Sequence, residues 1–192
     1  MSGWGLVTSI AFSSEVFKCN QRAPRRGLTL NLELYIISLL KGGYPMYAQV
    51  LGSTTFGLNG HVIGVEVDIN KNFPSFDIVG LPTTAVKESK ERVHSAIRNS
   101  GYHFPVDKVT VNLAPADLKK DGSGLDLPVA VGLLAASGDV AKEALEGIMF
   151  IGELSLKGEI RPVPGILSMV LAGREAGISK FVMAEEVTGE AL

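Results

Sequence analysis

The chain has 192 residues, a formal net charge of −2, and a composition that is 46% hydrophobic and 20% charged. This length suits one domain with a short appendage, and the apolar content argues against intrinsic disorder. The charge is uneven: residues 1–45 hold five basic and two acidic residues, whereas residues 46–192 hold 13 basic and 18 acidic ones. The main body is therefore not a globally basic nucleic-acid binder. Its single Cys19 excludes an internal disulfide, and no Cys/His cluster has the spacing of a zinc site.

Residues 1–45 differ from the rest of the chain. Their longest apolar run, within residues 28–40, is shorter than the ~20 residues that span a bilayer, and it lies too far in for an ordinary signal peptide. We therefore predict a cytoplasmic protein with no membrane contact. Codons for Lys41-Gly42-Gly43 can form a purine-rich ribosome-binding sequence shortly before Met46. This spacing suggests that translation starts at Met46 rather than Met1, that residues 1–45 are upstream read-through or poorly ordered, and that the domain is 46–192.

Strand-like segments open this body. Residues 46–58 and 61–69 flank Asn59-Gly60, a dipeptide typical of a tight hairpin turn. In the second segment, alternating branched residues are expected to face the core: Ile63, Val65, Val67 and Ile69. A third strand, residues 75–80, would complete a small antiparallel meander.

The clearest predicted helix follows, between Pro82 and Gly101. Its apolar face consists of Val86, Val93 and Ile97, with Ser89 beside them. A second face carries the stripe Lys87, Lys90, His94 and Arg98, interrupted by Glu91. This stripe is either an ordinary solvated helix face or a surface that contacts DNA phosphates.

The stretch KKDGSG, residues 119–124, joins a strand that ends at Pro115 to a helix predicted from Asp126 to Ser137. Asp126 fits the N-cap of that helix, and Pro128 falls in its first turn. Gly122 and Gly124 would let backbone amides approach an anion, whereas Asp121 and Asp126 bring negative charge to the same place. We prefer a tight loop-to-helix connection over an anion cradle.

This stretch could carry either of two kinds of catalysis. A nucleotide-binding P-loop requires a Gly-Lys pair, which occurs nowhere in the chain, so no cofactor is expected here. Ser123 could act as a nucleophile with Lys119, Lys120 or Lys157 as its base, although a lone serine in a glycine loop is a weak signal.

The last third of the chain contains a second predicted hairpin around Lys157-Gly158, a helix ended by Gly177, and a strand at residues 180–184. Strands and helices alternate without a fixed order, which favours an α+β fold with a mixed sheet and packed helices.

Four stretches together resemble a known family: FGLNGHVIGVEVDI, the long segment FDIVGLPTTAVKESKERVHSAIRNSGYHFP, VNLAPADLKKDGSGLDLPVAVGLLAA, and GELSLKGEIRPVPGIL. They are similar to the N-terminal Lon-protease-like (ChlI-type) domain of the magnesium-chelatase-like AAA+ proteins, the YifB or ComM family. The resemblance covers residues 46–192 and implies a fold like ribosomal protein S5 domain 2 and the Lon peptidase domain. It also implies that full-length members form hexamers, carry an ATPase module that uses ATP and magnesium, and act as DNA branch-migration helicases in natural transformation. It does not imply metal chelation by this branch.

Lon peptidases use a serine–lysine dyad, with the serine in a Lys-Asp-Gly-Pro-Ser-Ala-Gly stretch. Aligned from Lys120, the serine position falls on Gly124, and the lysine position falls on Leu167. Since leucine cannot act as a base, the resemblance implies a relative that is not a peptidase.

The expected function is therefore a non-catalytic domain that serves assembly and DNA interaction and has no metal site. Candidate DNA-facing groups are Lys87, Lys90, Arg98, Lys119 and Lys120. The alternatives are a divergent serine peptidase that uses Ser123 and a purely structural regulator of a partner ATPase.

Overall fold

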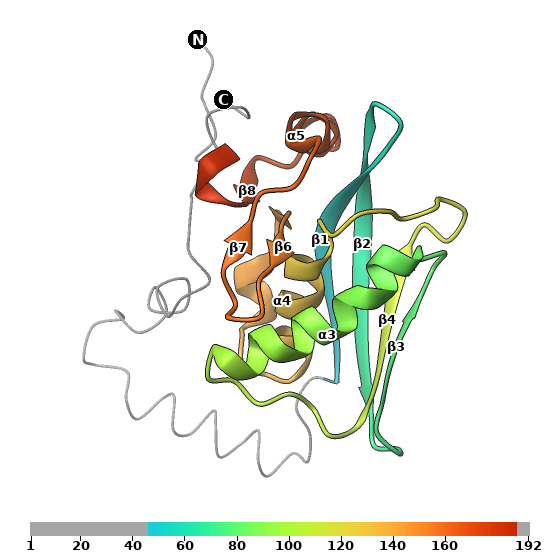
Figure 1. Cartoon of the computed structure of the whole chain (residues 1–192), viewed down its shortest axis with the longest axis vertical. Coiled ribbons are helices and arrows are strands. Elements are labelled where there is room, and N and C mark those ends of the chain that lie inside the picture. Colours follow the sequence, from blue (N-terminus) through green and yellow to red (C-terminus); the bar gives the residue numbers. More distant parts are fainter. Residues whose placement is uncertain (1–45, 188–192) are drawn as a thin grey trace, which may run out of the picture.

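The computed structural model describes residues 46–187, and within them a six-stranded mixed sheet forms the centre of the molecule (Figure 1). The strand order is β3-β4-β2-β1-β5-β8, and a separate β6-β7 hairpin lies beside the sheet. The strands are β1 Tyr47–Phe56, β2 Asn59–Asn70, β3 Ser75–Val79, β4 Lys108–Ala114, β5 Ile148–Phe150, β6 Glu153–Leu154, β7 Ile160–Arg161 and β8 Lys180–Val182. The helices of the described part are α3 Thr84–Asn99, α4 Asp126–Ala136 and α5 Ile166–Glu175, with short 3-10 turns η1 Lys142–Leu145 and η2 Glu185–Val187.

The β1–β2 hairpin turns two residues earlier than its sequence predicts. Phe56 pairs with Asn59, so the turn consists of Gly57 and Leu58, and Asn59-Gly60 lies inside β2. Position 60 requires glycine for another reason: a Cβ there would overlap the carbonyl oxygen of Ser168 on α5. The predicted turn signal is in fact a site of close helix–strand packing.

The predicted antiparallel meander is wrong. β3 pairs in parallel with β4, from Ser75↔Lys108 to Val79↔Asn112, and β4 lies between β3 and β2. Parallel neighbours need a crossover, and α3 supplies it between β3 and β4. The mixed sheet with packed helices agrees with the α+β class at this coarse level.

Helices cover the sheet on both faces. A Cβ added to Gly132 of α4 would lie 2.7 Å from Val67 and 3.6 Å from Val50, so α4 packs on the face that these valines share. Leu51 and Val62 alternate with them and pack instead in a cluster with Met169 and other residues of α5. Since neighbouring strand residues face opposite sides, α4 and α5 lie on opposite faces.

The predicted core patterns are confirmed. The four alternating residues of β2 are all buried, as are the four residues on the predicted inner face of α3. Gly101 and Gly177 follow α3 and α5 with positive φ angles, as expected for helix ends. Within residues 46–187, no helix is both long and apolar enough to cross a membrane. The expectations for residues 1–45 lie outside the described residues.

Candidate functional site

The stretch before α4 is held by backbone hydrogen bonds to a neighbouring loop. The amide of Lys120 donates to the carbonyl of Leu81 at 3.2 Å, and the amide of Thr83 donates to the carbonyl of Lys120 at 3.0 Å. From β1, the hydroxyl of Thr54 donates to the carbonyl of Asp121 at 2.9 Å. Residues 119–121 are thereby fixed against the segment that starts α3.

The carboxylate of Asp121 is engaged within the same loop. It accepts the amide of Gly122 at 2.9 Å and the hydroxyl of Thr83 at 3.0 Å. These two hydrogen bonds lower the pKa of Asp121, so the side chain is charged at neutral pH. Gly122 has φ +79°, which a glycine adopts readily. Asp121 therefore shapes the turn.

Lys120 cannot serve as the DNA contact that the sequence suggested. Its side chain is 0% exposed, and its ammonium donates to the carbonyl of Pro115. Burial lowers the pKa of Lys120, an effect that the nearby carboxylate of Asp117 partly offsets. An enclosed ammonium cannot reach a phosphate, so Lys120 is a structural lysine that closes loop 115–120.

Asp126 is not the N-cap that the sequence suggested. Leu125 occupies the N-cap without a side-chain cap, and Asp126 is the first helical residue. Its side chain is only 1% exposed and binds Arg92 of α3 through two contacts, Nε–Oδ2 at 2.6 Å and Nη2–Oδ1 at 3.1 Å. The amide of Leu154 in β6 also donates to Oδ2 at 3.2 Å. Asp126 therefore joins α3, α4 and the β6-β7 hairpin.

The pair remains charged at neutral pH. The hydrogen bond to Asp126 raises the pKa of Arg92 above its ordinary value. Burial raises the pKa of Asp126, while the guanidinium and the Leu154 amide act in the opposite direction. Two good hydrogen bonds to a guanidinium favour the carboxylate form, so this is a buried ion pair.

The amides at the start of α4 are already occupied. The amide of Asp126 donates to Ser123 at 3.1 Å, and that of Leu127 donates to Gly152 at 3.1 Å. Pro128 has no amide hydrogen, and Val129 makes the ordinary helical bond to Leu125. A phosphate or an oxyanion at the first turn of α4 would have to displace these bonds.

The two dyad positions carry no catalytic side chain. Gly124 is buried, and a Cβ there would meet only ordinary contacts, 3.7 Å from Ser53 and from Val163. Leu167 lies at the start of α5 with 49% of its surface exposed. There is thus room for a Cβ at 124, and the glycine itself leaves this position without a nucleophile.

Ser123 is not paired with the bases considered for it. Lys120 donates to Pro115, and Lys157 lies at the exposed turn of the β6-β7 hairpin. Lys119 is exposed and interacts electrostatically with Asp121. A serine nucleophile needs a base within hydrogen-bond reach, and this arrangement does not favour one.

The cations on α3 do not form a continuous positive surface. Lys90 is partly buried, 3.8 Å from the carboxylate of Asp77 and above the ring of Phe76. Lys87 and Arg98 are exposed but about 16 Å apart along the helix axis. The exposed residues between them include the acidic pair Glu88 and Glu91. His94 packs edge-on against Phe104.

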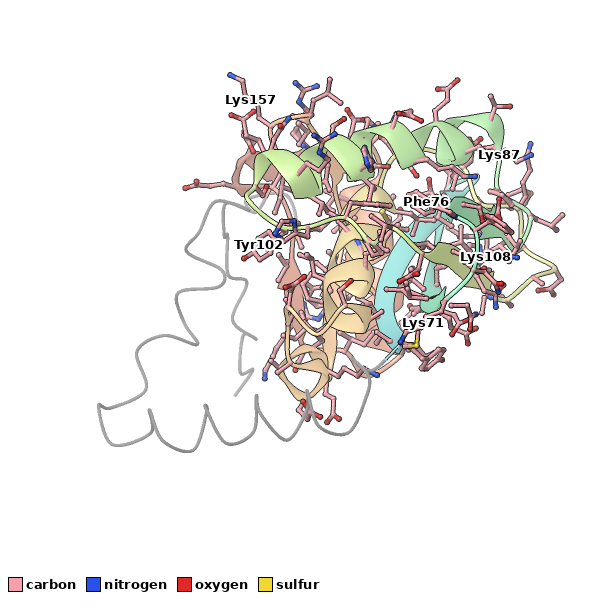
Figure 2. All side chains as sticks on the ribbon, turned by 90° about the horizontal axis from the view of Figure 1, so that it is seen from below. Lys71, Phe76, Lys87, Tyr102, Lys108 and Lys157 are labelled. Atoms are coloured by element: carbon pink, nitrogen blue, oxygen red, sulfur yellow. The ribbon has the colours of Figure 1, made fainter. Side chains whose placement is uncertain are left out.

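The structure brings Lys157 into this region, which the sequence did not reveal. The side-chain amide of Asn99 donates to the carbonyl of Leu156 at 2.6 Å, so the hairpin tip contacts the end of α3 that carries Arg98. Figure 2 shows Lys157 beyond one end of α3 and Lys87 at the other. No sequence signal indicates this contact, because β4, α4 and β5 separate the two elements along the chain.

Comparison with known proteins now assigns the chain to a family. The family model described as subunit ChlI of Mg-chelatase matches residues 65–187. The chain belongs to this family. It is 49% identical over 129 residues to the uncharacterized protein YifB of Salmonella typhimurium, covering 67% of this chain and 26% of that protein. It is 38% identical over 144 residues to the competence protein ComM of Haemophilus influenzae, covering 75% of this chain and 28% of ComM.

This ChlI-family chain therefore spans about a quarter of the length of these curated relatives. It is also similar to the Lon protease of Clostridioides difficile, at 25% identity over 150 residues, 74% of this chain and 19% of the protease. The YifB and ComM resemblance is confirmed, and the likeness to Lon is distant. Within residues 46–187, no group of three or more metal-binding side chains is gathered in one place.

Proposed function

We propose that this chain acts as the non-catalytic N-terminal domain of a magnesium-chelatase-like AAA+ ATPase and serves its assembly and its interaction with DNA. The supporting observation is the pair of positions Gly124 and Leu167, which leaves neither nucleophile nor base where Lon peptidases carry them. The occupied amides of Asp126 and Leu127 support the same proposal, because these two donors are not available to a developing oxyanion.

The finer features of the family belong to this proposal too. We infer an architecture like ribosomal protein S5 domain 2 and the Lon peptidase domain. We place the ATP and magnesium sites in the ATPase portion of longer members, and we propose a cytoplasmic hexamer that promotes DNA branch migration in competence. The Haemophilus influenzae relative is itself named a competence protein, which supports this link.

DNA contact is the less supported half of the proposed function. Net charge in residues 46–192 is negative, Lys120 is buried, Lys90 is engaged, and Lys87 and Arg98 lie far apart. Phosphate contacts need several free cations close together, so DNA binding by this domain would be weak and strongly salt-dependent.

Deletion in a longer relative tests the proposal. In Haemophilus influenzae ComM, we would remove the segment that matches this chain and measure particle mass with ATP, ATP hydrolysis, and DNA binding at several salt concentrations. We expect hydrolysis to persist while oligomer formation and DNA affinity fall. Loss of hydrolysis with intact oligomers would contradict the proposal.

The peptidase alternative and the DNA surface can be tested on the chain itself. If the chain cleaves casein and Ser123→Ala abolishes this cleavage, the peptidase alternative is correct and our proposal is wrong. For DNA, we would compare Lys87→Glu with Arg98→Glu by fluorescence anisotropy, with Lys142→Glu as the control, since Lys142 donates to Tyr47 on another part of the molecule. If the three variants bind DNA with equal affinity, the α3 surface is not part of the DNA contact.

A further inference from the structure

Asn59 and Gly60 form the one Asn-Gly pair of the chain. In such a pair the backbone nitrogen of the glycine can attack the asparagine side chain easily, because glycine has no Cβ that stands in the way. The side chain of Asn59 is exposed at the start of β2, and Gly60 beside it is partly covered. Residue 60 must be glycine, since a Cβ there would overlap the carbonyl oxygen of Ser168 on α5. The packing of α5 on β2 therefore imposes a reactive pair on the chain.

The same packing holds the pair in an unreactive conformation. Asn59 pairs with Phe56 and Gly60 pairs with Thr55, so the main chain at both residues is extended in the ladder. Reaction requires the peptide between residues 59 and 60 to turn until the Gly60 nitrogen meets Cγ of Asn59. The backbone of α5 stands against this peptide, because a Cβ on Gly60 would also lie 2.8 Å from the amide nitrogen of Met169. Figure 1 shows α5 and the hairpin tip at the same end of the molecule. The peptide is free to turn only when the hairpin separates from α5.

We propose that Asn59 is a deamidation site whose reaction is controlled by the packing of α5 on Gly60. The Gly60 nitrogen forms a bond to Cγ of Asn59, the Cγ–Nδ2 bond breaks, and the proton of the Gly60 nitrogen leaves with Nδ2 as ammonia. Water then opens the cyclic succinimide. Opening at Cγ gives aspartate, and opening at the main-chain carbonyl carbon of residue 59 gives isoaspartate. Water is the only other reactant, and the inference is independent of the proposed function.

Both products alter the hairpin. Residues 51–65 contain no Asp, Glu, Lys or Arg, so either product adds a negative charge to an otherwise uncharged segment. Isoaspartate also lengthens the main chain between residues 59 and 60 by one methylene carbon. Gly60 then cannot remain both opposite Thr55 and against Ser168, because these two neighbours fix its position in the unmodified chain. A chain that reacts while it is open should therefore not dock α5 normally again, and the opening becomes irreversible.

Peptide mapping by mass spectrometry tests the proposal on the whole chain after ageing in mildly alkaline buffer. Deamidation of Asn59 should be slower in the folded chain than in guanidinium chloride by about tenfold or more, since a folded segment reacts only in its open fraction. Ile166→Ala should accelerate the reaction several-fold in the folded chain. Ile166 is 2% exposed at the start of α5, and its truncation loosens that helix. Ile166→Val, a smaller truncation, makes the same comparison if Ile166→Ala does not fold.

Val93→Ala is the matched control. It also shortens a fully buried branched side chain, but on α3 and in the separate core cluster that contains α4. This variant should leave the rate at Asn59 unchanged in the folded chain. Asn72 is an internal reference within each sample, because it is exposed but followed by the bulky Phe73, and it should react slowly in every state.

Four results would overturn the inference. Asn59 could react equally fast in the folded and the denatured chain, or the Ile166 variants could react like the wild type although thermal melts show them folded and destabilised. The Val93 and Ile166 variants could be accelerated equally, which would assign control to global unfolding rather than to α5. Finally, Asn72 could match Asn59 in guanidinium chloride, which would show that Gly60 confers no special reactivity.

Discussion

Arg92 of α3 and Asp126 of α4 form a buried ion pair, with Nε–Oδ2 at 2.6 Å and Nη2–Oδ1 at 3.1 Å, and the Leu154 amide completes it. The three groups come from elements that are distant in sequence. Because the carboxylate is enclosed, the pair fixes how α3, α4 and the β6-β7 hairpin pack together.

Breaking this pair should cost considerable stability. We expect Asp126→Ala to lower the free energy of unfolding by about 3–5 kcal/mol, because it leaves a guanidinium without its partner. The surface pair between Arg161 and Glu153, at 3.8 Å, is the control, and Arg161→Ala, at the more exposed partner, should cost at most about 1 kcal/mol. Urea denaturation of both variants makes the comparison, and similar losses would contradict it. The double variant Arg92→Met, Asp126→Leu should recover much of the loss, since no charge remains buried.

Lys120 should make the free energy of unfolding depend on pH in the alkaline range. Burial lowers its pKa in the folded state, so the unfolded chain binds this proton more tightly. The resulting penalty is fully present below the folded-state pKa, and it disappears as the pH rises through that value toward the ordinary 10.5. The free energy of unfolding of the wild type, measured relative to Lys120→Met, should therefore increase across this window. Urea titrations at several pH values check it, and a flat or falling difference would contradict the buried ammonium.

Two glycines of the hairpin should respond differently to alanine. Gly60→Ala should destabilise the fold by about 2 kcal/mol or more, because the methyl group meets the rigid backbone of α5. Gly57→Ala should cost about 1 kcal/mol, since its surroundings are open and only its φ of +63° is unfavourable. Thermal melts of both variants provide the measurement. The reverse ranking would mean that α5 does not pack on Gly60.

Restoring the dyad should not restore peptidase activity. Gly124→Ser combined with Leu167→Lys should fold, since a Cβ fits at 124 and residue 167 is half exposed. A lysine becomes a base near neutral pH when burial lowers its pKa, and position 167 does not provide that burial. Casein hydrolysis should stay at background in this double variant while its circular dichroism matches the wild type. Measurable turnover would show that the loop still offers a working oxyanion site.

Local sequence patterns predicted the elements well, because alternation in β2 and the helical spacing of Val86, Val93 and Ile97 depend only on neighbours in the chain. They failed where distant segments decide the outcome. β3 was misplaced because its partner β4 begins about 30 residues later, beyond a crossover helix. Asn59-Gly60 was misread because the requirement for glycine comes from α5.

The candidate site shows the same division. The residues at both dyad positions could be read directly from an alignment to a family motif. The roles of Asp126 and Lys120 could not be predicted in this way. A single sequence does not distinguish an aspartate that caps a helix from a buried aspartate, nor an exposed lysine from an enclosed one. Their partners, Arg92 on α3 for Asp126 and the carbonyl of Pro115 in the same loop for Lys120, are found only in the folded structure.

The strand order β3-β4-β2-β1-β5-β8 also bears on how the chain can fold as it leaves the ribosome. The first strands to be synthesised, β1 and β2, occupy the centre of the sheet, and their hairpin can form before the other strands are made. β3 then has no partner until β4 is synthesised, after which β5 pairs with the free edge of β1 and finally β8 pairs with β5. The domain can therefore grow outward during translation, with a single waiting step set by the length of α3.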